Sequence, residues 1–208
     1  MIGMCDAGHR ILLKKNNFMN EKTKIIALVG MTGAGKSVIA DYLVSKGWGF
    51  ARFGQIVLDI VKERGLQPTE AVEKPIREEL RKEHGMAAMA ILNLPKFDKI
   101  LEEKNLVADG LYSWSEYKVL KDYYGDRLKV VAVYAPPEIR YARLEARILQ
   151  RADTDLRNRP ATKDQAKSRD YAEIENIEKG GPIAMADITF LNITTEEELY
   201  RQIDSVLG

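Results

Sequence analysis

Residues 30–37, read as GMTGAGKS, constrain this chain most, because they match the phosphate-binding pattern G-x-x-x-x-G-K-[ST] at every fixed position. The residues on both sides agree with that pattern. Residues 25–29 form an unbroken apolar run, typical of a buried parallel strand, and apolar residues recur at helical spacing over residues 38–44. The sequence therefore predicts a strand, a glycine-rich turn and a helix, in this order.

A turn of this composition is suited to binding the phosphates of a nucleotide. Glycines let the backbone turn tightly and approach the phosphates, so that successive N–H groups face the ligand at the positive end of the next helix. Lys36 would reach the β- and γ-phosphates, and the Ser37 hydroxyl would take a position on Mg²⁺. We expect ATP and Mg²⁺ as cofactors, bound here by Thr32, Gly33, Ala34, Gly35, Lys36, Ser37 and Val38. The alternative is a glycine-rich turn without a ligand.

The composition is that of an ordinary globular domain. Apolar residues make up 45% and charged residues 30% of the 208 residues, which argues against wholesale disorder. The formal net charge of +1 predicts no affinity for nucleic acid or membranes from overall charge. The single cysteine, Cys5, excludes an internal disulfide framework, and we expect a cytoplasmic protein. Residues 1–22 are expected to be a flexible extension, with Met19 as an alternative start of translation, and residues 23–208 the folded domain.

Strands alternate with helices along the rest of the chain. The expected strands are residues 25–29, 48–53, 105–108, 128–135 and 187–192. The expected helices are residues 54–64, 70–83 with an interruption or restart at Pro75, 86–94 ending before Pro95, 96–104, 113–124, a helix from Pro137, 166–179, and a last helix capped by Thr194 with Glu197. This alternation predicts a three-layer α/β/α fold with a five-stranded parallel sheet.

Polar residues follow the second and third predicted strands. Ligands bind beyond the carboxyl ends of the strands in an open α/β sheet, so Arg52 and Gln55 are candidates for contact with an acceptor substrate. A surface arginine and a helix-start glutamine are the alternative. Asp109 ends the third strand, where a carboxylate is placed to hold Mg²⁺ or the hydroxyl of an acceptor. A turn aspartate before glycine is the alternative there.

Two basic stretches give the chain local positive charge despite its near-neutral total. Over residues 70–83 the basic residues alternate with glutamates, which predicts a solvated helix face. The alternative is that Arg77 or Arg81 holds a phosphate of the acceptor, because a guanidinium binds phosphate in a bidentate manner. In the helix after Pro137, spacings of three and four place four side chains along one stripe: Arg140, Arg143, Arg147 and Arg151.

The polar stretch that follows is predicted to be a mobile loop. With its flanks it would form a lid, at about residues 147–165, that closes over the phosphates and expels water. Arg147 is therefore a candidate catalytic residue beside Lys36 and Asp109. An ordinary solvated basic segment is the alternative for Arg147, and also for Arg157 and Arg159 in the loop.

Six stretches make the chain resemble a known family: GMTGAGKS, FGQIVLDIVKERGLQPT, LRKEHG, ADGLYS, VYAPPEIRYARLEAR and IAMADITFLN. In this order they resemble the nucleoside and nucleotide kinase group of P-loop proteins, which includes adenylate kinase and dephospho-CoA kinase. The chain looks most like a family of small P-loop kinases described mainly from archaea. The resemblance covers residues 24–207, and only the first stretch is specific by itself.

This resemblance implies roles for particular residues. Arg143 and Arg147 would contact ATP, Asn192 would lie beside the adenine, and Asp109 would lie near Mg²⁺. A helical region at about residues 54–104 would bind the acceptor, and the expected acceptor contacts are Arg52, Gln55, Arg77, Arg81 and Tyr112. Relatives commonly carry an acidic residue where this chain has Gln55, which moves the expected base for the acceptor hydroxyl to Asp109.

Three hypotheses of function follow. The leading one is ATP- and Mg²⁺-dependent phosphoryl transfer to a small nucleotide-like acceptor, such as a nucleoside monophosphate or dephospho-CoA. The second is a regulatory P-loop protein that binds ATP and hydrolyses it only slowly, a hypothesis motivated by Gln55. The third is a kinase of a non-nucleotide metabolite such as a sugar. A monomer and a homodimer are both compatible with the sequence, and no nucleic-acid or membrane partner is expected.

Overall fold

The computed structural model describes residues 23–147 and 160–207. The predicted N-terminal extension, with Cys5, lies outside the described residues. So does most of the predicted lid, including Arg151, Arg157 and Arg159. Among the described residues, no helix has both the length and the apolar character that crossing a bilayer requires.

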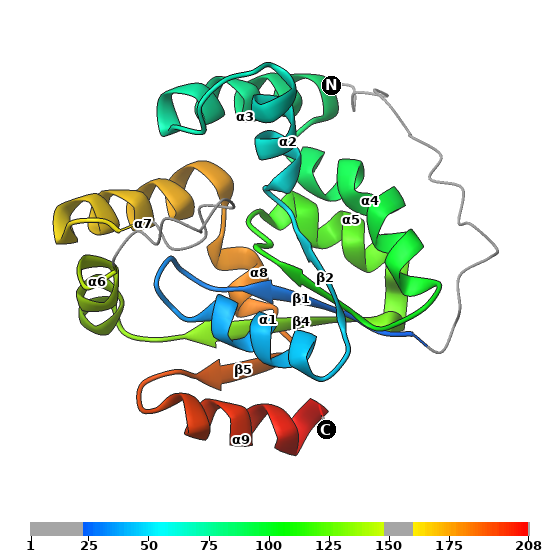
Figure 1. The fold of residues 1–208 in the computed structure, drawn as a ribbon, viewed down its shortest axis with the longest axis vertical. Coiled ribbons are helices and arrows are strands. Elements are labelled where there is room, and N and C mark those ends of the chain that lie inside the picture. Colours follow the sequence, from blue (N-terminus) through cyan, green and yellow to red (C-terminus); the bar gives the residue numbers. More distant parts are fainter. Residues whose placement is uncertain (1–22, 148–159, 208) are drawn as a thin grey trace, which may run out of the picture.

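Five strands form one parallel sheet (Figure 1). They are β1 Ile25–Val29, β2 Gly49–Arg52, β3 Leu106–Asp109, β4 Leu128–Tyr134 and β5 Ile188–Leu191. The strand order is β2-β3-β1-β4-β5, so β1 lies at the centre, hydrogen-bonded to β3 on one side and to β4 on the other. All five residues of β1 are buried, as its unbroken apolar sequence predicts for a central strand. The predicted five-stranded parallel sheet is confirmed.

Helices cover both faces of this sheet. They are α1 Lys36–Ser45, α2 Gln55–Glu63, α3 Glu70–His84, α4 Ala88–Leu101, α5 Trp114–Tyr124, α6 Pro137–Glu145, α7 Lys163–Ile177, α8 Gly180–Ala184 and α9 Glu196–Leu207. Alternate residues of β1 point to opposite faces. Ile25, Ala27 and Val29 belong to a core with α2 to α5, whereas Ile26 and Leu28 belong to a second core with α1 and α9. The predicted three-layer α/β/α arrangement is therefore confirmed.

Local sequence signals set several helix ends. Ser113 accepts a hydrogen bond from the N–H of Glu116, whose side chain in turn accepts from the N–H of Ser113, so α5 opens with a capping box. Thr162 and Gln165 form the same arrangement at the start of α7. Pro137 occupies the first turn of α6, where its missing N–H costs nothing.

The predictions about proline were wrong. Pro75 lies inside a continuous α3, and Pro95 lies inside α4, which runs through the predicted break as one helix. A proline in a helix interior costs about 3 kcal/mol. Leu94 and Phe97 on either side of Pro95 are buried in the core between the sheet and α4, and this packing outweighs the local preference.

Two boundaries near the C-terminus also differ from the predictions. The helix expected over residues 166–179 ends earlier, at Ile177, and the short helix α8 follows it. The last helix has its cap one residue later than expected, because the hydroxyl of Thr195 accepts a hydrogen bond from the N–H of Glu198. Residue spacing alone did not distinguish Thr194 from Thr195, since both are good caps.

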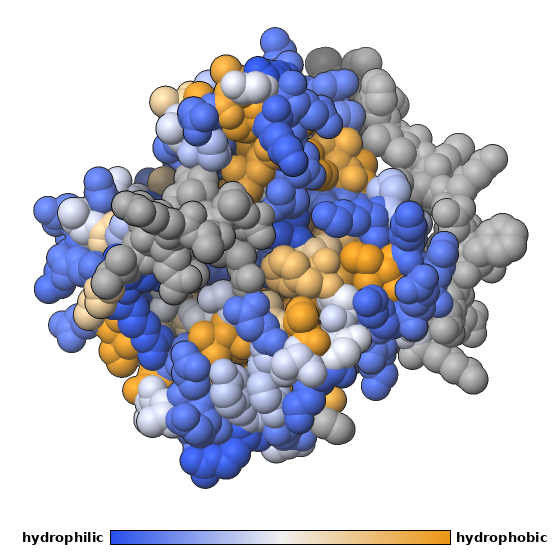
Figure 2. All heavy atoms as spheres, viewed as in Figure 1, coloured by the Kyte–Doolittle hydropathy of each residue, from blue (hydrophilic) through white to orange (hydrophobic). Residues whose placement is uncertain are grey.

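At Leu191 the outer edge of β5 is closed by a side chain. The Gln202 amide accepts a hydrogen bond from the N–H of Leu191 at 3.0 Å and donates one to the Leu191 carbonyl at 3.1 Å. On the face shown in Figure 2, hydrophilic residues interrupt the apolar areas. The sheet thus ends at β5 with both backbone groups of Leu191 satisfied.

Candidate active site

The phosphate loop, residues 30–37, joins the carboxyl end of β1 to the start of α1. Gly30, Gly33 and Gly35 all have positive φ angles, of 146°, 82° and 100°. A side chain at Gly30 would collide with the carbonyl oxygen of Val133, and one at Gly35 with the side-chain amide of Asn192. These positions therefore require glycine, both for their backbone conformation and for the space around them.

Lys36 is the first residue of α1, and its ammonium bends back over the loop. The Nζ donates to the carbonyl oxygen of Gly30 at 2.8 Å and to that of Met31 at 3.4 Å. Burial lowers the pKa of Lys36 to about 8, with a further lowering by the nearby ammonium of Lys179, against which Asp109 acts. Ser37 and Val38 follow in the first turn of α1, and the N–H of Val38 donates to the Gly35 carbonyl.

Asp109 ends β3, beside the strand that leads into the loop. In the sheet it is level with Leu28 of β1 and with Arg52 of β2. Its Oδ1 is buried and has no hydrogen-bond partner among the described residues. A buried carboxylate oxygen without a partner is costly, and such an atom suits a cation or a hydroxyl of a ligand. Asp109 thus lies within the electrostatic reach of Lys36, as its effect on the Lys36 pKa shows.

Arg143 and Asn192 meet on the other side of the loop. Arg143 Nη2 donates to the Asn192 side-chain oxygen at 3.2 Å, and the Asn192 amide donates to the carbonyl of Ala34 at 2.9 Å. Arg143 Nη1 is buried without a hydrogen-bond partner among the described residues, and burial lowers the pKa of this guanidinium. Two of the three residues that the resemblance connects with ATP, Arg143 and Asn192, are therefore joined to each other and to the loop.

Arg147 does not continue the helical stripe. Helix α6 ends at Glu145, and Arg147 is half-buried two residues further on, at the border of the described residues. Arg140, which the stripe prediction grouped with it, is 4% exposed and turned into the protein. The expected stripe of four arginines is therefore wrong as a continuous helical face.

The predicted acceptor residues have different surroundings. Arg77 donates to Glu70 and Glu73 on its own helix, which is the pairing expected of a solvated face. Gln55 bonds Asp59 one turn further along α2. Arg81 is half-buried, and its Nε has no hydrogen-bond partner in the described part of the chain. Of these side chains, Arg81 is the one with a buried donor left for a ligand.

Tyr112 lies in the segment between Asp109 and α5, and Glu116 lies in the first turn of α5. The N–H groups of Tyr112 and Ser113 both donate to Glu116 Oε2, at 2.9 and 3.0 Å. Glu116 is fully buried, and burial raises its pKa to about 7 even though these two N–H groups oppose the shift. The second oxygen of Glu116 finds no partner among the described residues. The sequence indicated Glu116 only as a helix cap.

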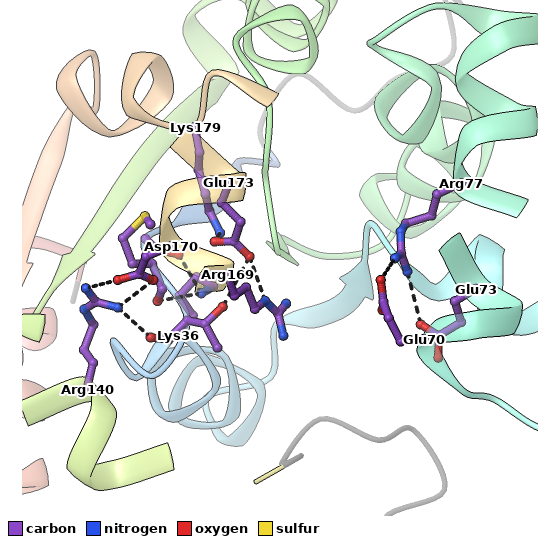
Figure 3. A network of polar contacts seen from close by, with 12 residues as sticks. Lys36, Glu70, Glu73, Arg77, Arg140, Arg169, Asp170, Glu173 and Lys179 are labelled. Carbon is purple, nitrogen blue, oxygen red and sulfur yellow. Dashed lines mark hydrogen bonds and ion pairs between the residues drawn. The ribbon is translucent and has the colours of Figure 1, made fainter. Parts of the chain in front are cut away.

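The sequence did not reveal how strongly α7 is bound to the loop. Arg140 of α6 forms a bidentate ion pair with Asp170 of α7, at 3.0 and 2.6 Å, and donates to the carbonyl of Thr32 at 3.0 Å. On the other face of the loop, the Thr32 hydroxyl donates to Glu173 Oε1 at 3.3 Å. Figure 3 shows Arg140 of α6 and Asp170 of α7 directed toward each other.

Glu173 is the centre of a charged cluster beside the loop. It accepts from Arg169 Nε at 2.9 Å and from Lys179 Nζ at 2.6 Å. Burial raises the pKa of Glu173, but the two cations outweigh it and lower the pKa to about 2. In Figure 3 this cluster is separate from the group formed by Arg77 with Glu70 and Glu73. The spacing of Arg169 and Glu173 is a sequence signal for a helical pair, but nothing in it points to the loop.

A parallel sheet with this loop after its central strand, ringed by basic side chains from α6 and α7, defines a P-loop kinase-like domain. Solved structures share the fold. TT1252 from Thermus thermophilus has a TM-score of 0.60 at 18% identity, covering 89% of this chain and 96% of its own. A shikimate kinase from Bacteroides thetaiotaomicron has a TM-score of 0.55 at 15% identity, covering 88% and 98%.

Sequence comparison gives the family. Residues 26–178 match the family model described as an AAA domain. A UPF0200 protein of Thermococcus gammatolerans is 31% identical over 185 residues, covering 88% of this chain and 93% of the relative. A UPF0200 protein of Pyrococcus horikoshii is 30% identical over 186 residues, covering 88% and 96%. The chain belongs to this UPF0200 family of P-loop domains, and the predicted resemblance to small archaeal P-loop kinases is confirmed.

Proposed function

We propose that this protein transfers the γ-phosphoryl group of ATP, with Mg²⁺, to a small nucleotide-like acceptor. The observation that carries the proposal is that Lys36 and Asp109 lie within electrostatic reach of each other at the ends of neighbouring elements. The ammonium of Lys36 lies over the phosphate loop, and the unpartnered Oδ1 of Asp109 ends the adjacent strand β3. A cation for the phosphates thus lies near a carboxylate for the acceptor hydroxyl, as phosphoryl transfer requires.

Different residues around the loop would bind different parts of the nucleotide and the acceptor. The loop N–H groups and Lys36 would bind the phosphate chain, and Arg169 would neutralise charge on the moving group. Arg143 and Asn192, which are bonded to each other and through Asn192 to the Ala34 carbonyl of the loop, would contact the adenine of the nucleotide. Asp109 would orient the acceptor hydroxyl or hold its proton. An arginine that stabilises the transferring group contributes about 10³- to 10⁵-fold in rate in related chemistry.

The donors present fit Mg²⁺. This ion uses one or two protein oxygens together with phosphate oxygens and water. Ser37 in the first turn of α1 is such a donor, and the unpartnered oxygen of Asp109 would be a second where it binds Mg²⁺ in place of the acceptor hydroxyl. The described residues contain no ready group of three or more metal-binding side chains. Bound Mg²⁺ would supply charge neutralisation between the phosphates.

An acceptor with an anionic group is supported by the cationic side chains on the acceptor side. Arg81 of α3 has a buried Nε without a partner among the described residues, and a guanidinium suits a phosphate. Arg52 lies level with Asp109 at the end of β2. Structural neighbours include kinases of shikimate and gluconate, so hydroxy acids belong in the test beside nucleotides.

A panel of acceptors tests the proposal. ADP release would be measured with ATP and Mg²⁺ alone and with AMP, CMP, UMP, GMP, dephospho-CoA, shikimate or gluconate. We expect one nucleotide-like acceptor to raise turnover at least tenfold. Lys36→Ala should then lower that turnover by about 100-fold or more, as loss of a charged transition-state contact does. Lys104→Ala, an exposed lysine before β3, should leave it unchanged.

The outcomes separate the hypotheses. Stimulation only by shikimate or gluconate would support phosphoryl transfer but would show that the acceptor is a hydroxy acid and not nucleotide-like. Full turnover in Lys36→Ala would remove the loop from the mechanism. Slow hydrolysis that no acceptor stimulates would favour the second candidate, an ATP-binding switch, which is supported by the hydrogen bond between Thr32 of the loop and Glu173 of α7.

A further inference from the structure

Lys179 is a buried lysine beside the phosphate loop that no sequence motif marks. Its side chain is 1% exposed. The ammonium donates to Glu173 Oε2 at 2.6 Å and lies 4.3 Å from the centre of the Tyr112 ring. These are its contacts within the described residues, and an ammonium has three N–H donors. A donor is therefore left for a further acceptor.

The backbone adopts an uncommon conformation to place this side chain. Glu178, directly before Lys179, has a φ of 54° and a ψ of 40°, and it is the one residue other than glycine with positive φ among residues 23–147 and 160–207. This left-handed conformation ends α7 and turns the chain, so that the N–H of Lys179 donates to the carbonyl of Glu173. Strained positions of this kind cluster at functional sites.

The position of Lys179 links the phosphate loop to the acceptor side. Its partner Glu173 also binds the Thr32 hydroxyl of the loop, whereas Tyr112 follows Asp109 and β3. The ammonium of Lys179 is close enough to that of Lys36 to contribute to lowering the Lys36 pKa. Figure 3 shows both side chains directed into the same cluster.

Two ammonium groups and a guanidinium lie close together in this cluster. They belong to Lys36, Lys179 and Arg169, and the carboxylates within their electrostatic reach include Glu173, Asp109 and, on the α5 side, Glu116. Arg169 and Lys179 share the carboxylate of Glu173. Lys36 and Lys179 repel each other, and burying two such cations is costly unless an anion joins them. The cluster is thus suited to an additional anionic group between the loop and Tyr112.

We propose that Lys179 is a second phosphate-binding lysine, which contacts the γ-phosphoryl group of the bound nucleotide while Lys36 holds the chain from the loop. This inference rests on the proposed function, because it needs ATP in the loop. The γ-phosphate is the terminal group and would face the acceptor, and the ammonium of Lys179 lies beside Tyr112, which is an expected acceptor contact. Lys179 therefore distinguishes nucleoside triphosphates from diphosphates.

Calorimetric titration with Mg²⁺ and either a non-hydrolysable ATP analogue or ADP tests this role. Lys179→Met keeps the length and apolar volume of the side chain. We expect its Kd for the triphosphate to rise about 10- to 100-fold, the range for one lost charged hydrogen bond, while its Kd for ADP changes less than twofold. Lys167→Met, an exposed position on α7, should change neither Kd.

The double variant Lys179→Met/Glu173→Gln separates phosphate binding from a structural role. If Lys179 only balances Glu173, removing both charges restores the preference for the triphosphate, and the proposal is overturned. Phosphate binding predicts that the preference stays lost. An unchanged ratio of the two Kd values in Lys179→Met also overturns it. Failure of the wild-type protein to bind either nucleotide would instead overturn the proposed function.

Discussion

The ammonium of Lys36 donates to two carbonyl oxygens of its own loop, which are weaker acceptors than the oxygens of a phosphate. Its pKa of about 8 is lowered by burial first and by Lys179 second. The protonated form is the one that attracts phosphate. The affinity for ATP should therefore be full below about pH 8 and fall as the pH rises above it.

We expect the Kd for Mg²⁺-ATP to rise by up to about tenfold per pH unit above pH 8, because the protonated fraction of Lys36 falls up to about tenfold with each unit above its pKa. Titrations at intervals from pH 6.5 to pH 9.5 measure this change in Kd. Lys36→Met binds more weakly and should lack this dependence. A constant Kd up to pH 9.5 in the wild-type protein would contradict the assignment of the lysine.

Glu173 gives a prediction about acid stability. Its pKa of about 2 in the folded protein lies below the usual value of 4.5, because Lys179 and Arg169 outweigh the effect of burial. A lowered carboxylate pKa stabilises the fold above pH 4.5, and this contribution is lost as the pH falls towards 2. Urea unfolding at pH 5 and pH 3 should show that Glu173→Gln loses less stability on acidification than the wild type, by about 1–2 kcal/mol. Equal losses would disprove the ion pairing.

Between elements, the ion pair of Arg140 and Asp170 fastens α7 to α6 and to the phosphate loop. Both side chains are less than 10% exposed, and Arg140 also donates to the carbonyls of Thr32 and Ala135. We expect Asp170→Ala to lower the free energy of unfolding by about 3–5 kcal/mol, because it leaves a buried guanidinium without its partner. Denaturant unfolding measures this change.

A second ion pair between the same helices serves as the control. Lys163 of α7 and Glu145 of α6 are 3.6 Å apart, but their side chains are 65% and 47% exposed. Glu145→Ala should therefore change the free energy of unfolding by less than about 1 kcal/mol. Similar losses in Glu145→Ala and Asp170→Ala would mean that burial is not what makes the Arg140 pair important.

The elements themselves were largely predictable, and their exceptions have physical reasons. An apolar run predicted the strand of residues 25–29, and a glycine pattern predicted the loop after it. Both signals are local, since each lies within a few consecutive residues. The continuity of α4 through Pro95 depends on burial against the sheet, which is decided by distant residues. The network around Glu173 was missed for the same reason, since Thr32 and Glu173 are 141 positions apart.

For the whole molecule, the candidate site joins parts of the chain that are distant in sequence. The loop after β1, the end of β3, helices α6 and α7 and Asn192 after β5 all contribute to it. A ligand that binds only the folded state stabilises it, by about 2.7 kcal/mol at a concentration of 100 times its Kd. For a chain of this length we expect Mg²⁺-ATP to raise the Tm by about 5–10 °C.

Thermal unfolding with and without nucleotide measures this increase. Lys36→Ala should show a much smaller shift at the same ATP concentration. An equal shift in the variant would mean that the nucleotide binds elsewhere. At this scale the sequence predicted the fold class, because strand-like and helix-like patterns of apolar residues alternate along the chain and this alternation determines the fold class. It did not predict the acceptor, because no motif marks the side chains that would bind it, such as Arg81 with its buried, unpartnered Nε among the described residues.

The amide of Gln202 has a further consequence for the margin of the sheet. It occupies the backbone donor and acceptor of Leu191 as the peptide group of a sixth strand would. An extended segment from another molecule that approaches β5 at Leu191 finds these groups already taken, so it cannot pair with that residue. One glutamine of the last helix thus removes one position of this edge from strand pairing with a second molecule.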